Sequence, residues 1–238
     1  MKIEILYPEI CNLFGDMGNM SYLRCCLPEA EFVSTPFGTE PLFASETPDL
    51  IYMGPTTEKY QEKIIVQLSP YRVRLKELAE SDVPMLFTGN AGEILFQSIE
   101  NWDGAKIEGL DILPFTAKRS RYDRFNGLVL GRFQDRFDTM GFQSQFTFWY
   151  GNNTSCPFIT CKRGIGLNRE SNKEGILWHR LIVTSQLGPI LVNNPDLTRW
   201  LLDTMGAPDA DVAFETEIRA AYAIRMQEFL NPKTKFQL

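Results

Sequence analysis

The chain has 238 residues, of which 44% are hydrophobic and 23% charged, with a formal net charge of −6 at pH 7. This composition is ordinary for a globular protein and excludes the disordered, collagen-like and coiled-coil classes. No apolar run approaches the ~20 residues of a membrane-spanning helix, and the basic stripe that nucleic-acid binders carry is not visible, so we expect no membrane span and no nucleic-acid partner.

Apolar runs of strand length alternate with helical patterns over the first hundred residues. We expect strands at residues 1–6, 50–53 and 84–87, and helices near 20–27 and over 58–68. A further helix is predicted to start at Ser69-Pro70, with the serine as its cap and the proline at its first position. Residues 93–96, which follow a glycine-rich turn, also look helical. This succession of strand, tight turn and helix is typical of an α/β fold with a parallel sheet.

The middle of the chain has a different character. Residues 107–165 contain alternating, aromatic-rich segments punctuated by glycines and arginines, which predict hairpins and an antiparallel extension. Another strand is expected at 181–184, with helices at 197–205 and 214–230, where apolar residues recur every three or four positions. The sequence has no internal repeat and no linker, so we expect a single domain over residues 1–238.

The cysteines and the single histidine limit the available chemistry. The five cysteines are an odd number without a CxxC pair, namely Cys11, Cys25, Cys26, Cys156 and Cys161. Reduced thiols and a cytoplasmic location are therefore expected, in agreement with an N-terminus that lacks the pattern of a signal peptide. The single histidine, His179, is predicted on a strand. One histidine alone excludes a multi-histidine metal site. We expect no metal and no cofactor.

The turn at residues 88–92 (Thr-Gly-Asn-Ala-Gly) follows a predicted strand and precedes a predicted helix. A strand that feeds a sharp turn into a helix is the geometry of a nucleophile elbow, which exposes the residue at its apex. Ligands of open α/β sheets bind at this carboxyl edge. The turn therefore predicts a site, but its apex lacks a nucleophilic side chain.

Several short motifs occur in a fixed order along nearly the whole chain. They are residues 12–19 (NLFGDMGN), 49–54 (DLIYMG) with Gln61, the turn within 84–96, 109–113 (GLDIL), Gly141-Phe142, and 188–195 (GPILVNNP). In this order they resemble class I glutamine amidotransferases of the cobyric acid synthase type, and among these the glutaminase subunit of lipid II isoglutaminyl synthase. The resemblance implies a flavodoxin-like, mostly parallel sheet with helices on both faces and an antiparallel β extension.

The positions that carry the chemistry of that family differ in this chain. Gly89 stands where the family's elbow has its nucleophilic cysteine, and Leu187 stands where the catalytic histidine precedes Gly-Pro. The family's Glu-Asn-His triplet reads Gln143-Ser144-Gln145, which leaves Gln145 in place of its histidine. Its Gly-Gly-Gly turn reads Gly54-Pro55-Thr56, and a proline has no N–H to offer an oxyanion. The resemblance thus implies a catalytic set that is not intact, with degenerate positions at Gly89, Leu187 and Gln145.

The same register implies a ligand-binding set. Its members are Gly54, Pro55, Gly89, Asn90 and Arg124. Arg124 stands where the family carries an arginine that resembles an anchor for the carboxylate of glutamine, although a surface arginine is the alternative. The turn at Gly89 either cradles a ligand or is only a tight turn. The aromatic run 146–150 either lines a pocket or packs in the core.

Two functions are compatible with these residues. Glutamine hydrolysis in this family needs a thiolate, a base and backbone donors, and the first two are missing in this register. The first hypothesis is a catalytically degenerate amidotransferase subunit that binds a small amide or amino acid. It would pair with a Mur-ligase-like or other ATP-dependent synthetase in bacterial cell-wall or cobalamin biosynthesis. The alternative is an active amidotransferase or amide hydrolase with a relocated nucleophile, at Thr88, Ser144 or Cys161.

Overall fold

A six-stranded sheet forms the centre of the structure, a computed structural model that describes residues 1–237. In spatial order its strands are β13 (Ile176–Trp178), β14 (Leu181–Thr184), β4 (Met85–Thr88), β3 (Leu50–Met53), β1 (Lys2–Leu6) and β2 (Glu31–Thr35). All neighbours are parallel except β13, which pairs antiparallel with β14. The parallel strands, numbered along the chain, have the order 2-1-3-4-5 of flavodoxin-like folds. The expected flavodoxin-like sheet is confirmed.

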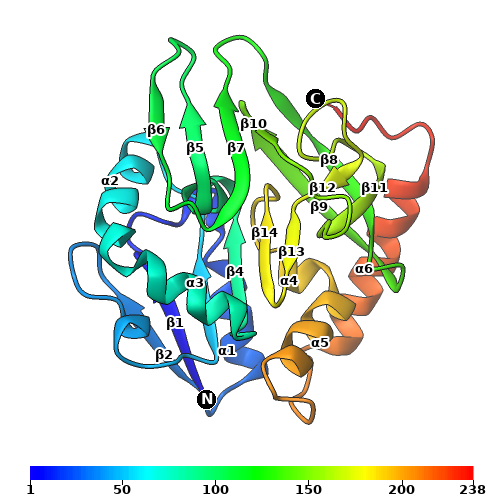
Figure 1. The fold of residues 1–238 in the computed structure, drawn as a ribbon. Coiled ribbons are helices and arrows are strands. Elements are labelled where there is room, and N and C mark those ends of the chain that lie inside the picture. Colours follow the sequence, from blue (N-terminus) through cyan, green and yellow to red (C-terminus); the bar gives the residue numbers. More distant parts are fainter. Residues whose placement is uncertain (238) are drawn as a thin grey trace.

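Helices cover both faces of this sheet, as predicted (Figure 1). They are α1 (Gly18–Cys26), α2 (Glu58–Leu68), α3 (Arg72–Glu80), α4 (Ile190–Asn193), α5 (Pro195–Thr204) and α6 (Glu215–Leu230). Successive side chains of a strand point to opposite faces. On β3, Ile51 and Met53 accordingly pack in one core with α2 and α3, whereas Leu50 and Tyr52 pack in a second core with α1 and α5.

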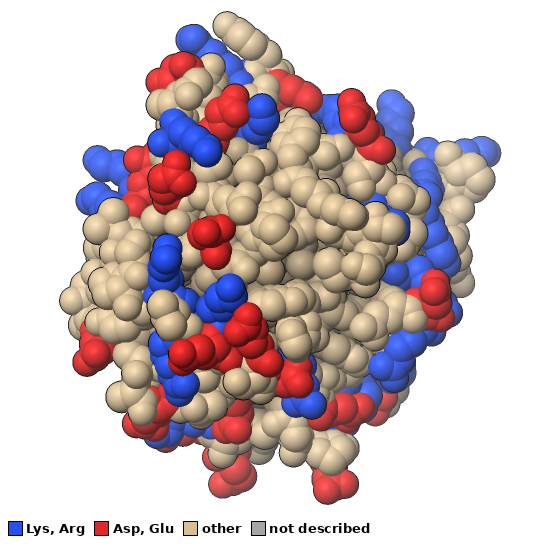
Figure 2. All heavy atoms as spheres, in the orientation of Figure 1, with Lys and Arg blue, Asp and Glu red and all other residues tan. Residues whose placement is uncertain are grey.

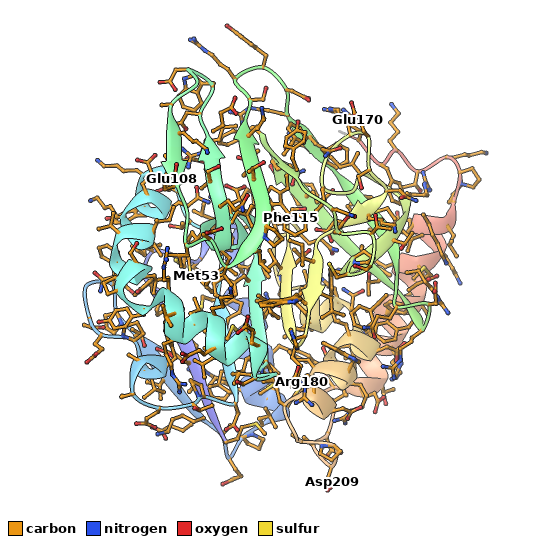
Figure 3. The ribbon with its side chains drawn as sticks, in the orientation of Figure 1. Met53, Glu108, Phe115, Glu170, Arg180 and Asp209 are labelled. Carbon is orange, nitrogen blue, oxygen red and sulfur yellow. The ribbon has the colours of Figure 1, made fainter. Side chains whose placement is uncertain are left out.

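Two four-stranded sheets lie beyond the carboxyl ends of the parallel strands, at the top of Figure 1. The first consists of β10 (Thr147–Tyr150), β7 (Leu113–Arg119), β5 (Phe96–Glu100) and β6 (Lys106–Glu108). The second consists of β12 (Lys173–Glu174), β11 (Ile159–Arg163), β8 (Phe125–Phe133) and β9 (Phe137–Gln145). The predicted antiparallel extension is confirmed, apart from β5 and β7, which pair in parallel. Phe115 of β7, labelled with Met53 in Figure 3, joins this extension to the core under α2 and α3.

Two local predictions were wrong, namely Ser69 as the cap of α3 and Phe96 as part of a helix. Ser69 begins a 3-10 turn, Ser69–Tyr71, and its hydroxyl donates to the carbonyl of Ile65 at 2.8 Å, so it closes α2 and does not cap α3. Gly89–Leu95 is a 3-10 helix, and Phe96 already begins β5. Phe96 is fully buried and pairs with Leu113 of β7, so tertiary pairing overrides the local helical pattern.

The surface carries mixed charge. On the face drawn in Figure 2, Lys and Arg side chains are interspersed with Asp and Glu. None of the helices within residues 1–237 combines the length and the apolar character that crossing a bilayer requires.

A buried carboxylate fastens the amino-terminal strand to the following segments. Glu4 of β1 has no exposed surface. Its oxygens accept from the hydroxyl of Thr35 and the backbone N–H of Leu42, both at 2.6 Å, and from the backbone N–H of Phe43 at 2.9 Å. Burial raises the pKa of Glu4. One side chain therefore satisfies three donors that the sheet would otherwise bury without partners.

We expect Glu4→Ala to lower the free energy of unfolding by roughly 2–4 kcal/mol, because each buried donor left without an acceptor costs about 1–3 kcal/mol. Chemical denaturation measures this loss. Glu31→Ala, on the exposed side of strand β2, is the matched control and should change stability by less than about 0.5 kcal/mol. Equal effects of the two variants would contradict this role of Glu4.

Candidate functional site

A cavity of about 220 Å³ lies at the carboxyl edge of the parallel sheet. We call it the elbow cavity. The loops after β1, β3, β4 and β14 and the β9–β10 segment enclose it, and its walls include Pro55, Gly89, Glu93, Arg124, Gln145 and Leu187. Ligands of such sheets bind at this edge, so the cavity is the candidate functional site.

Gly89 begins the turn directly after β4 and has a backbone φ of +57°. A Cβ atom at this position would lie 2.6 Å from Leu187 Cδ2 and 2.7 Å from Pro55 Cβ. Both distances are far below van der Waals contact. Leu187 and Pro55 therefore occupy the space into which a side chain at position 89 would project.

Polar groups near the turn are largely committed to one another. The Asn90 amide donates to the Thr56 carbonyl at 2.8 Å and accepts from the Thr56 N–H at 3.0 Å. The Gly89 N–H donates to the Gln186 carbonyl at 3.1 Å, and the Leu187 N–H to the Phe142 carbonyl at 2.9 Å. These donors hold the turn in place and are not directed at a reacting oxygen.

A buried polar cluster supports the turn from behind. Asp16 accepts from the hydroxyl of Thr88 at 2.6 Å and from the phenol of Tyr52, and the Asn19 amide donates to it at 3.1 Å. Burial raises the pKa of Asp16 to about 6, although these donors oppose the shift. The cluster ties the loop after β1 to the carboxyl ends of β3 and β4.

Glu93 places a second buried carboxylate in the cavity wall. The side-chain amide of Gln61 donates to one of its oxygens at 2.9 Å, and the indole N–H of Trp149 donates to the other at 3.1 Å. The Arg119 guanidinium lies behind Gln61 and donates to it at 2.6 Å. Burial raises the pKa of Glu93 to about 7.

Ser185 also lines the cavity, and a third buried carboxylate stands behind it. Its hydroxyl donates to Glu174 at 2.9 Å and accepts from the Gln143 amide at 2.6 Å. Glu174 is fully buried and also accepts from the Thr184 hydroxyl and the Gln186 amide. Burial raises the pKa of Glu174, and these donors oppose that shift.

The sequence has close relatives among proteins of known function. It is 30% identical over 196 residues, 81% of this chain and 79% of the relative, to the lipid II isoglutaminyl synthase (glutamine-hydrolyzing) subunit GatD of Staphylococcus aureus. The chain belongs to the GatD family. It is also 23% identical to the GatD subunit of Streptococcus pneumoniae, over 86% of this chain and 80% of that protein. No protein-family model matches the sequence.

Solved structures agree with the GatD assignment at the level of the fold. A glutamine amidotransferase from Thermotoga maritima superposes with a TM-score of 0.55 over 94% of this chain and 92% of its own, at 13% identity. The PurLQS structure from the same organism superposes with a TM-score of 0.53 over 92% of this chain and 98% of its own, at 10% identity. The predicted class I glutamine amidotransferase-like fold is confirmed.

The structure brings most of the residues singled out from the GatD-like motifs to one place. Pro55, Gly89, Asn90, Gln145 and Leu187 all line the elbow cavity. Arg124 lines it as well, with its guanidinium 5.0 Å from the centre of the Phe146 ring. Its side chain is therefore directed over an aromatic wall of the cavity.

Gly54 is the exception among these residues, because it does not line the cavity. A Cβ atom at this position would lie 2.5 Å from the backbone oxygen of Cys11. Close approach of two backbone segments therefore accounts for this glycine.

The three candidates for a relocated nucleophile are placed differently. Thr88 is fully buried, and its hydroxyl donates to Asp16. Cys161 lies in β11, away from the cavity lining, and burial raises the pKa of its thiol. Ser144 lines the cavity, but its hydroxyl donates to the Asn126 amide oxygen at 2.7 Å, which is not a base.

His179 lies far from the cavity, and the prediction that it belongs to a strand was wrong. It occupies the turn between β13 and β14 with a φ of +55° and contacts Asp82 at 3.2 Å. Its neighbour Arg180 directly precedes β14 at the amino-terminal edge of the sheet, in the lower part of Figure 3. Within residues 1–237, no three His, Cys, Asp or Glu side chains are arranged to hold a metal ion.

Two cavity residues, Glu93 and Ser185, were missed at the sequence level. Glu93 is in the elbow motif, four positions after Gly89, so the motif itself contained a usable signal. Ser185 follows β14, but its partner Glu174 reaches it only through the pairing of β13 with β14. No local pattern identifies that contact.

We expect Gly89→Ala to lower the free energy of unfolding by about 2–5 kcal/mol, since a left-handed backbone costs a non-glycine residue about 1–2 kcal/mol and overpacking about 1–3 kcal/mol. Gly206→Ala is the matched control, because Gly206 also has a positive φ, +84°, but open space around it. Gly206→Ala should lower the free energy of unfolding only by the about 1–2 kcal/mol that the left-handed backbone costs. Denaturant unfolding measures both variants.

The double variant Gly89→Ala/Leu187→Ala tests the packing itself. Removal of the Leu187 side chain should relieve the clash, so the double-mutant cycle should give a favourable coupling of at least about 1 kcal/mol. Additive losses would show that Leu187 does not fill the space next to position 89.

Proposed function

We propose that this glutamine amidotransferase-like subunit has lost glutamine hydrolysis and acts as a binding or partner subunit of an ATP-dependent ligase. The observation that carries the proposal is the packing around Gly89. The apex of the elbow has no side chain, and Leu187 and Pro55 fill the space in which a nucleophile would lie. Loss of a nucleophile or of its base costs several orders of magnitude in rate, and the two losses are not additive.

We propose that none of the three catalytic positions of the family is functional in this chain, where they are occupied by Gly89, Leu187 and Gln145. It also assigns ligand binding to the cavity residues Pro55, Gly89, Asn90 and Arg124, with Gly54 as their backbone support. Arg124 lines the cavity and supplies a cation at its wall, which suits the carboxylate of a small amino acid or amide. The cavity of about 220 Å³ is large enough for a ligand of that size.

The partner is inferred from the names of the relatives. The GatD proteins of Staphylococcus aureus and Streptococcus pneumoniae are subunits of a glutamine-hydrolyzing lipid II isoglutaminyl synthase. We therefore expect this chain to pair with a synthetase subunit of the Mur-ligase-like type, and to serve cell-wall and not cobalamin synthesis. We further propose that residues 1–238 form one domain that works in the bacterial cytoplasm, in keeping with five unpaired cysteines.

A second candidate function, hydrolysis of an amide by a relocated nucleophile, is favoured by one observation. Ser185 lines the elbow cavity and donates to the buried carboxylate of Glu174 at 2.9 Å. In such a pair the serine hydroxyl would act as the nucleophile and the carboxylate, whose pKa is raised, as its base. However, other donors to Glu174 stabilise its ionised form and weaken it as a base.

Ammonia release from L-glutamine discriminates the two candidates. Tagged protein is captured from its native lysate together with any ligase that accompanies it, because amidotransferases of this type work in complexes. We expect no release above that of a mock capture, with an ATP-dependent ligase in the eluate. The Ser185→Ala variant should give the same result as the unmodified protein.

Robust release would contradict the proposal, and the sensitivity of that release would identify its origin. Release abolished by a thiol reagent would indicate that a cysteine has taken over the reaction. Release abolished by Ser185→Ala but retained in Ser144→Ala would instead establish the Ser185–Glu174 pair as the catalytic centre.

A further inference from the structure

The wall of the elbow cavity contains a carboxylate that neither proposed function uses. Glu93 is 2% exposed and lines the cavity from the 3-10 helix after Gly89. Each of its oxygens accepts one hydrogen bond, from Gln61 and Trp149 respectively. A carboxylate oxygen has a second lone-pair site, so each oxygen keeps an acceptor position for a further donor.

The charge of Glu93 is compensated only at a distance, since the Coulomb attraction of Arg119 lowers its pKa without a direct ion pair. The nearby cation is Arg119 of β7, whose terminal nitrogens donate to Gln61, Glu62 and Asn101 and not to Glu93 itself. A second carboxylate, Glu58 of α2, lines the same cavity and raises the pKa of Glu93 further. Against these two acidic residues the cavity lining has one cation, Arg124, so its formal charge is one negative unit when both are ionised.

We propose that Glu93 is the specificity-determining residue of the elbow cavity and that it selects ligands carrying a primary ammonium group. The inference rests on the proposed function, because it concerns the ligand that the non-catalytic site would bind. Glu93 would bind the ammonium group of the ligand, whereas Arg124 is the expected anchor for the ligand's carboxylate.

The chemistry of the carboxylate accounts for this selectivity. A neutral amide side chain at this position could both donate and accept, whereas an ionised carboxylate only accepts. It therefore interacts well with an ammonium group and poorly with a carbonyl or a second carboxylate. In a cavity with low exposure to water, a charge-assisted hydrogen bond is about twice as strong as a neutral one.

Protonation of Glu93 should be linked to binding. The pKa of Glu93 in the free protein is raised to about 7 by burial, so a large fraction of the carboxyl groups is protonated at neutral pH. A bound ammonium group stabilises the ionised form, and binding therefore releases a proton. Below the pKa the affinity for amines should fall by up to tenfold for each unit of pH, whereas above it the affinity should be constant.

Isothermal titration calorimetry with three probes of similar size tests the inference on the full chain, in complex with its partner where one is captured. The probes are L-glutamine, 4-aminobutanamide, which lacks the carboxylate, and glutaramate, which lacks the amine. We expect the two amines to bind at least tenfold more tightly than glutaramate, and their affinity to fall between pH 8 and pH 6. Glu93→Gln should abolish both the preference and the pH dependence.

Glu58→Gln is the matched control, since it removes the same charge from the same cavity but from a half-exposed side chain. It should change amine affinity by less than about threefold, in keeping with solvent screening. The inference is overturned if glutaramate binds as tightly as the amines, if the amines do not bind, or if both variants have equal effects.

Two features of this test separate a wrong inference about Glu93 from a variant that does not fold and from a failure of the proposed function. If Glu93→Gln does not fold, as judged by its unfolding transition, the pH dependence and the proton release of the unmodified protein still decide the question. Because no probe reports on hydrolysis, a negative result here leaves the ammonia-release test of the proposed function unaffected.

Discussion

The close packing of Gly89 against Leu187 and Pro55 is the constraint around which the candidate site is built. These residues come from three different loops, after β4, β14 and β3, that meet at the carboxyl edge of the parallel sheet. A side chain at position 89 would collide with both neighbours, at 2.6 and 2.7 Å from its Cβ atom. The three positions therefore form a mutually adapted apolar unit, and a side chain at the apex requires its neighbours to change as well.

The polar surroundings of this unit have a supporting role. Asp16 binds the loop after β1 to Thr88 and Tyr52, directly behind the turn. Asn90 closes the turn on Thr56 through two hydrogen bonds. The scaffold around the elbow is thus extensively hydrogen-bonded, although the apex residue Gly89 has no side chain. Such an arrangement is expected of a subunit whose fold still presents a cavity or a surface to other molecules.

Much of the fold could be predicted from the sequence, because its signals are local. Strand β3 is a continuous apolar run bounded by a turn, and such runs predicted four of the five parallel strands, namely β1, β3, β4 and β14. Strand β2 was not predicted, because its mixed, half-exposed residues give no apolar run. Phe96 was assigned to a helix, since its pairing with Leu113 is a tertiary contact that no local pattern reveals.

The candidate site could be located by its aligned motifs but not understood from them. The motif register alone led us to propose Gly89 and Leu187 as altered positions, whereas their contact with Pro55 depends on three loops meeting in space. The Ser185–Glu174 contact depends on strand pairing in the same way. The cavity wall formed by Glu93 and Trp149 joins the elbow to β10, and that proximity is set by packing of the extension on the main sheet.

Covalent labelling with a diazoketone analogue of glutamine is the most direct test of the central claim that this site lacks a nucleophile. Such a reagent alkylates an activated nucleophile that receives the glutamine side chain, and intact-mass and peptide mass spectrometry locate the adduct. We predict no adduct on any residue that lines the elbow cavity, with the partner subunit present or absent. A stoichiometric adduct on Ser144, Ser185 or another cavity residue would contradict the loss of catalysis and would identify the group that performs it.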